Sequence, residues 1–171
     1  MNRSRKIKRL AMLGILCTIA LILSYVELLL PPLYAAIPGI KRGLANVAVV
    51  FVLWRFSVRD AALVSLLRIL LVSILFGNAM ALAYSLSGAA LSLCAMALLK
   101  KSGLFSGVGV SVAGAVFHNV GQILCAMALL GTAEIGYYLI MLTVTGTVSG
   151  IFVGLAGAVA VSRVPQKYTR I

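Results

Sequence analysis

The sequence predicts an all-α, polytopic membrane protein with six transmembrane helices in a single domain spanning residues 1–171. Hydrophobic residues make up 63% of the chain and charged residues 11%, whereas soluble domains hold roughly 45–50% and about 25%. The apolar residues fall into six runs, and the cationic residues cluster between these runs. That distribution is typical of the cytoplasmic loops of membrane proteins.

The spans are expected at about residues 10–30, 43–54, 60–76, 79–99, 105–130 and 135–161. The first follows a basic N-terminus and is about long enough to cross a bilayer, so we expect a retained helix rather than a cleaved signal peptide. Pro31 and Pro32 end it, because proline cannot extend a helix. Ser57 and Asp60 have the spacing of a capping box, which predicts the start of the third helix.

The second span decides the topology, because about 12 residues cover only half a bilayer as a helix. If it crosses, and the N-terminus is cytoplasmic, 12 of the 15 Lys and Arg residues lie inside, two lie outside and one lies within the membrane. If it does not cross, five lie inside and nine outside. The positive-inside rule therefore predicts six crossings with both termini in the cytoplasm.

Composition and motifs argue against several functions. The net charge of +12 comes from short clusters between apolar runs, which is not the pattern of a nucleic-acid-binding protein. Cys17, Cys94 and Cys125 lie in apolar runs without a C-x-x-C pair, so we expect neither a disulfide framework nor a metal site. The sequence has no P-loop, and its single aspartate cannot form an Asp-rich magnesium–diphosphate site. We expect no cofactor, and the sequence favours a protein without catalysis of its own.

The fifth span has the most informative polar pattern. Small and polar residues recur there at helical spacing and share one face. They are Ser111, Ala115, His118, Gln122 and Cys125, with Asn119 beside them. Such a face lies against protein or water rather than lipid. Interhelical hydrogen bonds, worth about 0.6 kcal/mol each, explain Ser111. For His118, Asn119 and Gln122 the sequence favours a binding site.

Four charged residues break the apolar pattern elsewhere. Arg68 lies about 12 Å into the third span, a position that costs at least about 2.5–3.5 kcal/mol. Since no acid is expected near its depth, Arg68 snorkels toward the membrane surface, contacts the backbone carbonyls around Asn46, or faces an anion in a cavity. Lys41 and Arg42 precede the second span on the outer side, as a solvated pair or as an anion-capturing pair. Glu27 is expected to be their counter-ion.

The sequence thus predicts an outward-opening substrate site. Its predicted lining residues are Lys41, Asn46, Arg68, His118, Asn119 and Gln122, with Glu27 as a counter-ion and no metal ligands. In the sixth span, glycines at intervals of four predict close approach of a neighbouring helix. They are Gly146, Gly150 and Gly154, followed by Gly157. We expect this neighbour to belong to the same chain, the alternative being a partner subunit.

Residues 38–46, Pro-Gly-Ile-Lys-Arg-Gly-Leu-Ala-Asn, resemble the P-G-I-K-x-G-L-A-N signature of a bacterial membrane family. That family is described both as the Gx transporter family and as heptaprenyl diphosphate synthase component I. Further matches are Leu67-Arg68, Phe76-Gly77, Ser87-Gly88, Ser111-Val112 and His118-Asn119-x-Gly121-Gln122. Arg42 stands in the variable slot, where an apolar residue is expected, which argues against a role for Arg42 itself.

The two family descriptions imply different functions. As a transporter, the chain resembles the S components of energy-coupling-factor transporters, six-helix proteins that bind a vitamin-like ligand while an ATPase module in other chains supplies energy. This implies a substrate-binding or transport protein of the bacterial cell membrane, for a small cofactor-, isoprenoid- or quinone-related ligand that Lys41 and Arg68 suit if it is anionic. As a synthase component, it would be a noncatalytic membrane partner of a soluble prenyl synthase. The third alternative, a plain membrane anchor, predicts that the polar face of the fifth span tolerates Ala and Leu.

Overall fold

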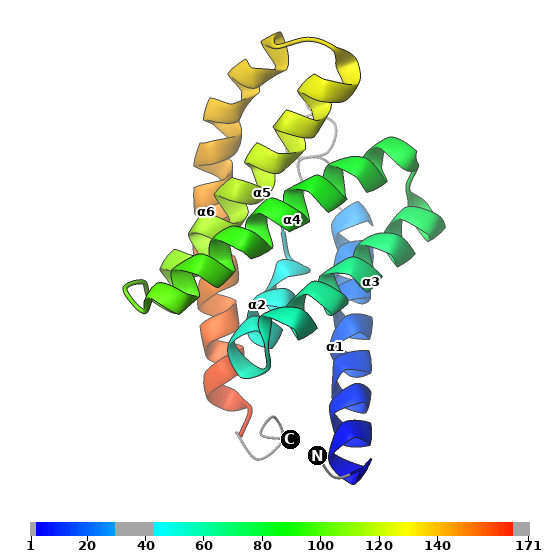
Figure 1. The fold of residues 1–171 in the computed structure, drawn as a ribbon, viewed down its shortest axis with the longest axis vertical. Helices are drawn as coiled ribbons and strands as arrows, with labels where there is room; N and C mark the ends of the chain where they lie inside the picture. Colours follow the sequence, from blue (N-terminus) through cyan, green and yellow to red (C-terminus); the bar gives the residue numbers. More distant parts are fainter. Residues whose placement is uncertain (1–2, 30–42, 166–171) are drawn as a thin grey trace.

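The computed structural model describes residues 3–29 and 43–165, and every regular element in these ranges is helical. The elements are α1 (Arg3–Leu29), α2 (Asn46–Arg55), α3 (Val58–Phe76), α4 (Ala79–Ser102), α5 (Gly107–Leu130), the short 3₁₀ helix η1 (Glu134–Tyr137) and α6 (Tyr138–Arg163). The α-helices follow the six predicted spans in order. The start of α1 and the end of α6 lie at the same end of the molecule (Figure 1).

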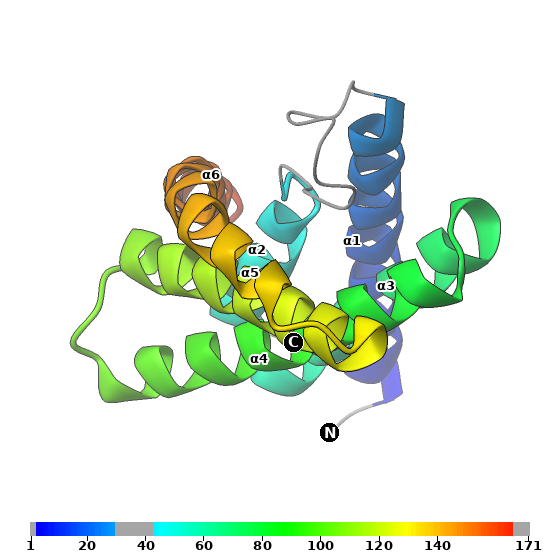
Figure 2. The same ribbon diagram turned by 90° about the horizontal axis from the view of Figure 1, so that it is seen from above.

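Helix α2 is short, and its centre is fully enclosed by the other helices. Residues 48–53 are all buried, and Val52 and Leu53 have no exposed surface. In Figure 2, α2 lies between α6 and α1, and it also packs against α3. Its 10 residues extend for about 15 Å, half of a roughly 30 Å hydrocarbon core. Because its centre faces protein rather than lipid, this short helix does not need the length of a lipid-facing span.

Polar contacts bring several helix ends together at what we call the basic end, the end that carries Arg9, Arg55, Arg59, Lys100 and Lys101. Arg9 of α1 bonds to Asp60 at the start of α3 (2.6 Å). Arg55 of α2 donates to the carbonyls of Val161 and Val164 at the end of α6. Lys100 of α4 donates to the carbonyl of Leu53. Successive helices therefore alternate in direction, and α2 returns the chain to the end where α1 began.

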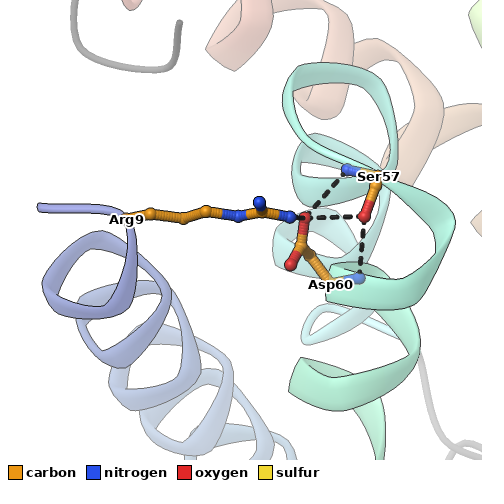
Figure 3. A network of polar contacts seen from close by, with 3 residues as sticks. All are labelled: Arg9, Ser57 and Asp60. Carbon is orange, nitrogen blue, oxygen red and sulfur yellow. Dashed lines mark hydrogen bonds and ion pairs between the residues drawn. The ribbon is translucent and has the colours of Figure 1, made fainter. Parts of the chain in front are cut away.

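A network of polar contacts joins the start of α3 to α1 at this end (Figure 3). Ser57 accepts a hydrogen bond from the Asp60 N–H (3.2 Å), and the Asp60 carboxylate accepts one from the Ser57 N–H (3.2 Å). The capping box predicted from the sequence is thus confirmed. The same carboxylate oxygen also accepts a hydrogen bond from the Arg9 guanidinium.

Helices α4, α5 and α6 pack closely through glycines. A Cβ built at Gly121 of α5 would lie 2.6 Å from the Ser87 carbonyl oxygen of α4. A Cβ at Gly150 of α6 would lie 2.6 Å from the Val112 Cα of α5. The glycine face of α6 therefore packs within the chain, against α5 and, at Gly157, against Val50 of α2.

Among the described residues, four helices are long and apolar enough to cross a membrane. They are Lys6–Leu29, Ala79–Ser102, Gly107–Leu130 and Glu134–Arg163. Helix α2 is too short by this measure, and α3 has 19 residues but includes Arg59, Asp60 and Arg68. Helix α6 exposes large apolar residues on the surface away from its glycines, among them Ile140, Val144 and Phe152. These features identify a membrane protein, because such a face has no protein cover and suits lipid.

Candidate functional site

A cavity of about 40 Å³ opens among the helices, on the side of the apolar core that faces away from the basic end. One water needs about 10–15 Å³, so the cavity has room for a small polar group. All six α-helices contribute to its lining. The lining residues are Ser24, Glu27, Gly43, Asn46, Arg68, Ile69, Val72, Ser73, Ser85, Ala115, His118, Asn119, Gln122 and Ser149.

Arg68 is the most unusual residue of this lining. It comes from the middle of α3 and is 8% exposed. Its Nη2 donates to the Asn46 Oδ1 at 3.4 Å, near the upper limit for a hydrogen bond. Its Nε is buried and has no hydrogen-bond partner among the described residues. A buried guanidinium with an unused donor is costly, and an anion in the cavity would satisfy it.

Glu27, near the end of α1, also lines the cavity. Its Oε1 accepts hydrogen bonds from the backbone N–H groups of Gly43 and Leu44, the latter at 3.3 Å. Gly43 has φ +77°, a left-handed conformation that glycine adopts without strain. This turn brings the chain into α2 and places Asn46 against Arg68.

The structure corrects one expectation about Glu27. From the estimated depths, we predicted that no acid would lie near Arg68. Glu27 and Arg68 instead line the same cavity and are close enough to interact electrostatically. The reason is that the prediction compared only heights along separate helices, whereas α1 packs against α3 and both long side chains reach the same cavity.

Helix α5 supplies the polar face that the sequence predicted. His118, Asn119 and Gln122 all line the cavity. The His118 ring packs against Gly88 of α4, where a Cβ would lie 2.9 Å from the imidazole. The Asn119 Nδ2 donates to the Leu142 carbonyl of α6 (2.6 Å), so Asn119 also ties two helices together. Ser111 of the same face is buried away from the cavity, and its Oγ has no hydrogen-bond partner among the described residues. The interhelical hydrogen bond predicted for Ser111 is therefore wrong, and the residue serves as a small side chain in a closely packed interface.

Five of the six predicted site residues therefore surround one cavity: Asn46, Arg68, His118, Asn119 and Gln122. Lys41, the sixth, lies outside the described residues, as does Arg42. Whether the five bind a ligand stays a prediction. Sequence reasoning missed four serines in the lining, Ser24, Ser73, Ser85 and Ser149. Ser24 precedes Glu27 by three residues, a helical spacing that could have revealed it.

The donors around the cavity suit recognition of a small polar group. They combine one guanidinium, one imidazole, three amides and several hydroxyls with a single carboxylate. Within residues 3–29 and 43–165, no three His, Cys, Asp or Glu side chains gather as a metal site would require. The arrangement can therefore hold a ligand by hydrogen bonds and charge.

The chain was compared with models of known protein families, with curated proteins and with solved structures. The family model for heptaprenyl diphosphate synthase component I matches residues 16–160. The chain belongs to this family. No curated relative and no solved structure matched. The resemblance seen in the sequence is thereby confirmed, and every residue that lines the cavity falls within the match to heptaprenyl diphosphate synthase component I.

Proposed function

We propose that this membrane protein binds a small anionic ligand in the cavity and serves as the substrate-binding component of a transport system. The observation that carries the proposal is the buried Arg68, whose Nε lacks a partner beside the cavity. A guanidinium within a span costs at least about 2.5–3.5 kcal/mol on insertion scales. Charged residues within membrane spans commonly mark substrate pathways. An anionic ligand would offset the cost of burying Arg68.

The proposed topology has six crossings, with the basic end in the cytoplasm of a bacterial cell. The alternation of helix direction and the gathering of cations at one end support it. The cavity then lies in the outer half of the membrane and opens outward. Lys41, at the outer side of this topology, would attract anions toward the cavity.

The sequence has no P-loop, which agrees with a transport system whose ATPase lies in other chains. We therefore propose an ATPase or coupling module as a partner, in the manner of energy-coupling-factor transporters. The ligand class we propose is a cofactor-, isoprenoid- or quinone-related molecule with an anionic group. Its apolar part would lie among Ile69, Val72 and the neighbouring lipid, and its anionic group would meet Arg68.

The first test asks what the purified protein carries. Native mass spectrometry of the protein in lipid nanodiscs should reveal a copurified small molecule that is lost from Arg68→Ala. Arg68→Lys should retain part of the binding, because an ammonium keeps the charge without the forked donors. His118→Ala should weaken retention, since the imidazole lines the same cavity.

Arg59→Ala is the matched control, because Arg59 lies on the same helix but is exposed and outside the cavity. It should retain the molecule as the wild type does. Equal retention by the wild type, Arg68→Ala and His118→Ala would refute the site.

The second candidate function is that of a noncatalytic membrane subunit of a heptaprenyl diphosphate synthase, and the family's own description favours it. A soluble prenyl synthase would be the partner, docking at the basic end, where Leu104 is 85% exposed. Affinity purification should then recover the synthase, and its product formation should fall when this chain is removed. Arg68→Ala should leave that activity unchanged if the cavity has no part in it.

A further inference from the structure

Glu27 occupies the place where an anionic ligand group would find strong hydrogen-bond donors. Its Oε1 accepts from the backbone N–H groups of Gly43 and Leu44. These groups lead directly into α2, and the N-terminus of a helix attracts anions through its dipole and its unpaired N–H groups. The left-handed Gly43 helps to turn its N–H toward α1, as in other backbone sites that bind anions.

Arg68 supplies a second set of donors to the same cavity, from α3. Its side chain is more than nine-tenths buried, and its Nε has no partner among the described residues. Its contact with Asn46 is long, at 3.4 Å, and can be exchanged at little cost. The lining of the cavity thus includes Gly43, whose N–H bonds to Glu27, and the Arg68 guanidinium, and Glu27 is the carboxylate within its described lining.

We propose that Glu27 is an internal competitor for the anionic group of the ligand. A carboxylate or phosphate group that bonds to Arg68 displaces the Glu27 carboxylate from Gly43 and Leu44 and takes over these N–H groups. Two anions cannot share the same donors, because like charges repel strongly at low dielectric. This inference rests on the proposed function, since it assigns a mechanism to the same cavity.

Displacement of Glu27 would release one end of α1. This helix packs against α2 and α3, and polar side chains hold it near both ends. At the basic end, Arg9 bonds to Asp60 (2.6 Å), and at the far end Glu27 bonds to the start of α2. Anion binding therefore loosens the far end of α1 while Arg9 and Asp60 keep the near end in place (Figure 3).

Titration of inorganic phosphate and of acetate into the protein, in nanodiscs of uncharged lipid, tests the competition. Glu27→Gln keeps an oxygen for the Gly43 N–H but removes the negative charge. It should bind at least one of the two anions about tenfold more tightly than the wild type, a difference of about 1.4 kcal/mol. Glu134→Gln is the matched control, since Glu134 is exposed and outside the cavity, and its affinities should be unchanged.

The outcomes separate this inference from the proposed function. If Glu27→Gln binds both anions as weakly as the wild type, or more weakly, Glu27 is no competitor and the inference is overturned. If Arg68→Ala binds as Glu27→Gln and the wild type do, the cavity itself is not the anion site and the proposed function fails. Loss of binding in Arg68→Ala together with tighter binding in Glu27→Gln supports both.

A measurement on the wild type covers the case in which Glu27→Gln does not fold. Hydrogen exchange should become faster over residues 23–29 at the end of α1 when phosphate or acetate, whichever binds the wild type, is added. Exchange over the first turn of α3, next to Asp60, should stay the same. Slower or unchanged exchange at the end of α1 would show that Glu27 remains in place and would overturn the inference.

Discussion

At the scale of single residues, several charged side chains of this protein bond to neighbouring helices. Lys100 donates to the Leu53 carbonyl and lies 5.3 Å from the centroid of the Trp54 ring. Arg55 donates to the last carbonyls of α6. Cations at helix C-termini satisfy unpaired carbonyls and interact favourably with the helix dipole. Two of the cations that the positive-inside rule counts therefore also join helices.

Asp60 takes part in the cap of α3 and also binds Arg9, and mutations can separate these two roles. It closes the capping box with Ser57 and also receives Arg9 from α1. We expect Asp60→Ala to lower the free energy of unfolding by about 1–2 kcal/mol, because it removes the carboxylate half of the capping box together with the ion pair, although the Ser57 cap on the backbone N–H remains. Arg9→Ala should cost less than about 1 kcal/mol, since a third of the Arg9 side chain is exposed and the cap remains.

Unfolding in detergent, followed by circular dichroism, would measure both variants. Lys8→Ala is a suitable control, since its side chain is exposed on the same helix. A larger loss for Arg9→Ala than for Asp60→Ala would contradict the importance of the cap.

At the scale of the helices, glycines set how closely α5 can approach its neighbours. Gly114 of α5 faces Met96 of α4, and Gly154 of α6 faces Val108 of α5. Without apolar driving force in lipid, association depends on close packing of such small residues. Close packing of α4, α5 and α6 in turn brings Ser85, His118 and Ser149 to the same cavity.

Gly121→Ala tests this packing. The added methyl would lie 2.6 Å from the Ser87 carbonyl oxygen and 2.8 Å from the Gly88 Cα, both of which belong to the backbone of α4. Since backbone cannot move aside as a side chain can, we expect a loss of about 1–3 kcal/mol in the free energy of unfolding.

Gly14→Ala is the matched control, because a Cβ at Gly14 of α1 meets nothing within 4 Å. Alanine favours a helix interior over glycine, so this variant should be neutral or more stable by up to about 1 kcal/mol. Denaturation of both variants under the same conditions gives the comparison. Equal stability of Gly121→Ala and the wild type would mean that α4 and α5 are not as close as described.

At the scale of the whole molecule, the apolar core and the cavity occupy different halves. The core cluster surrounds α2 and includes Leu13 of α1 and Val153 of α6. The cavity lies beyond it, toward the start of α2. This division is suited to a protein that holds its helices together on one side and binds a ligand on the other.

The proposed six crossings can be tested by labelling single cysteines after Cys17, Cys94 and Cys125 are replaced. Lys6→Cys at the start of α1 and Leu104→Cys between α4 and α5 should react with an impermeant maleimide only in permeabilised cells. Tyr137→Cys, in the exposed connection between α5 and α6, should react in intact cells. The measurement also decides whether α2 crosses. If it does not, Lys6→Cys and Leu104→Cys would label from opposite sides of the membrane.

Much of this architecture could be predicted from local properties of the chain. The length of an apolar run and the charges beside it act within a segment, so the number and order of the helices and the capping box at Ser57 were accessible. The polar face of α5 followed from helical periodicity, and that face does line the cavity at His118 and Gln122.

What the tertiary structure decided depends on how helices lie across one another. Packing of α1 against α3 brings Glu27 to the cavity of Arg68, although their positions along separate helices suggested otherwise. Close packing turns the glycines of α6 toward α5 and encloses α2 as a core helix rather than a lipid-facing span. The sequence alone therefore determined the helices, their order and the residues that could not face lipid. Packing alone determined which of these residues meet, because contacts between distant segments depend on crossing angles that no single segment encodes.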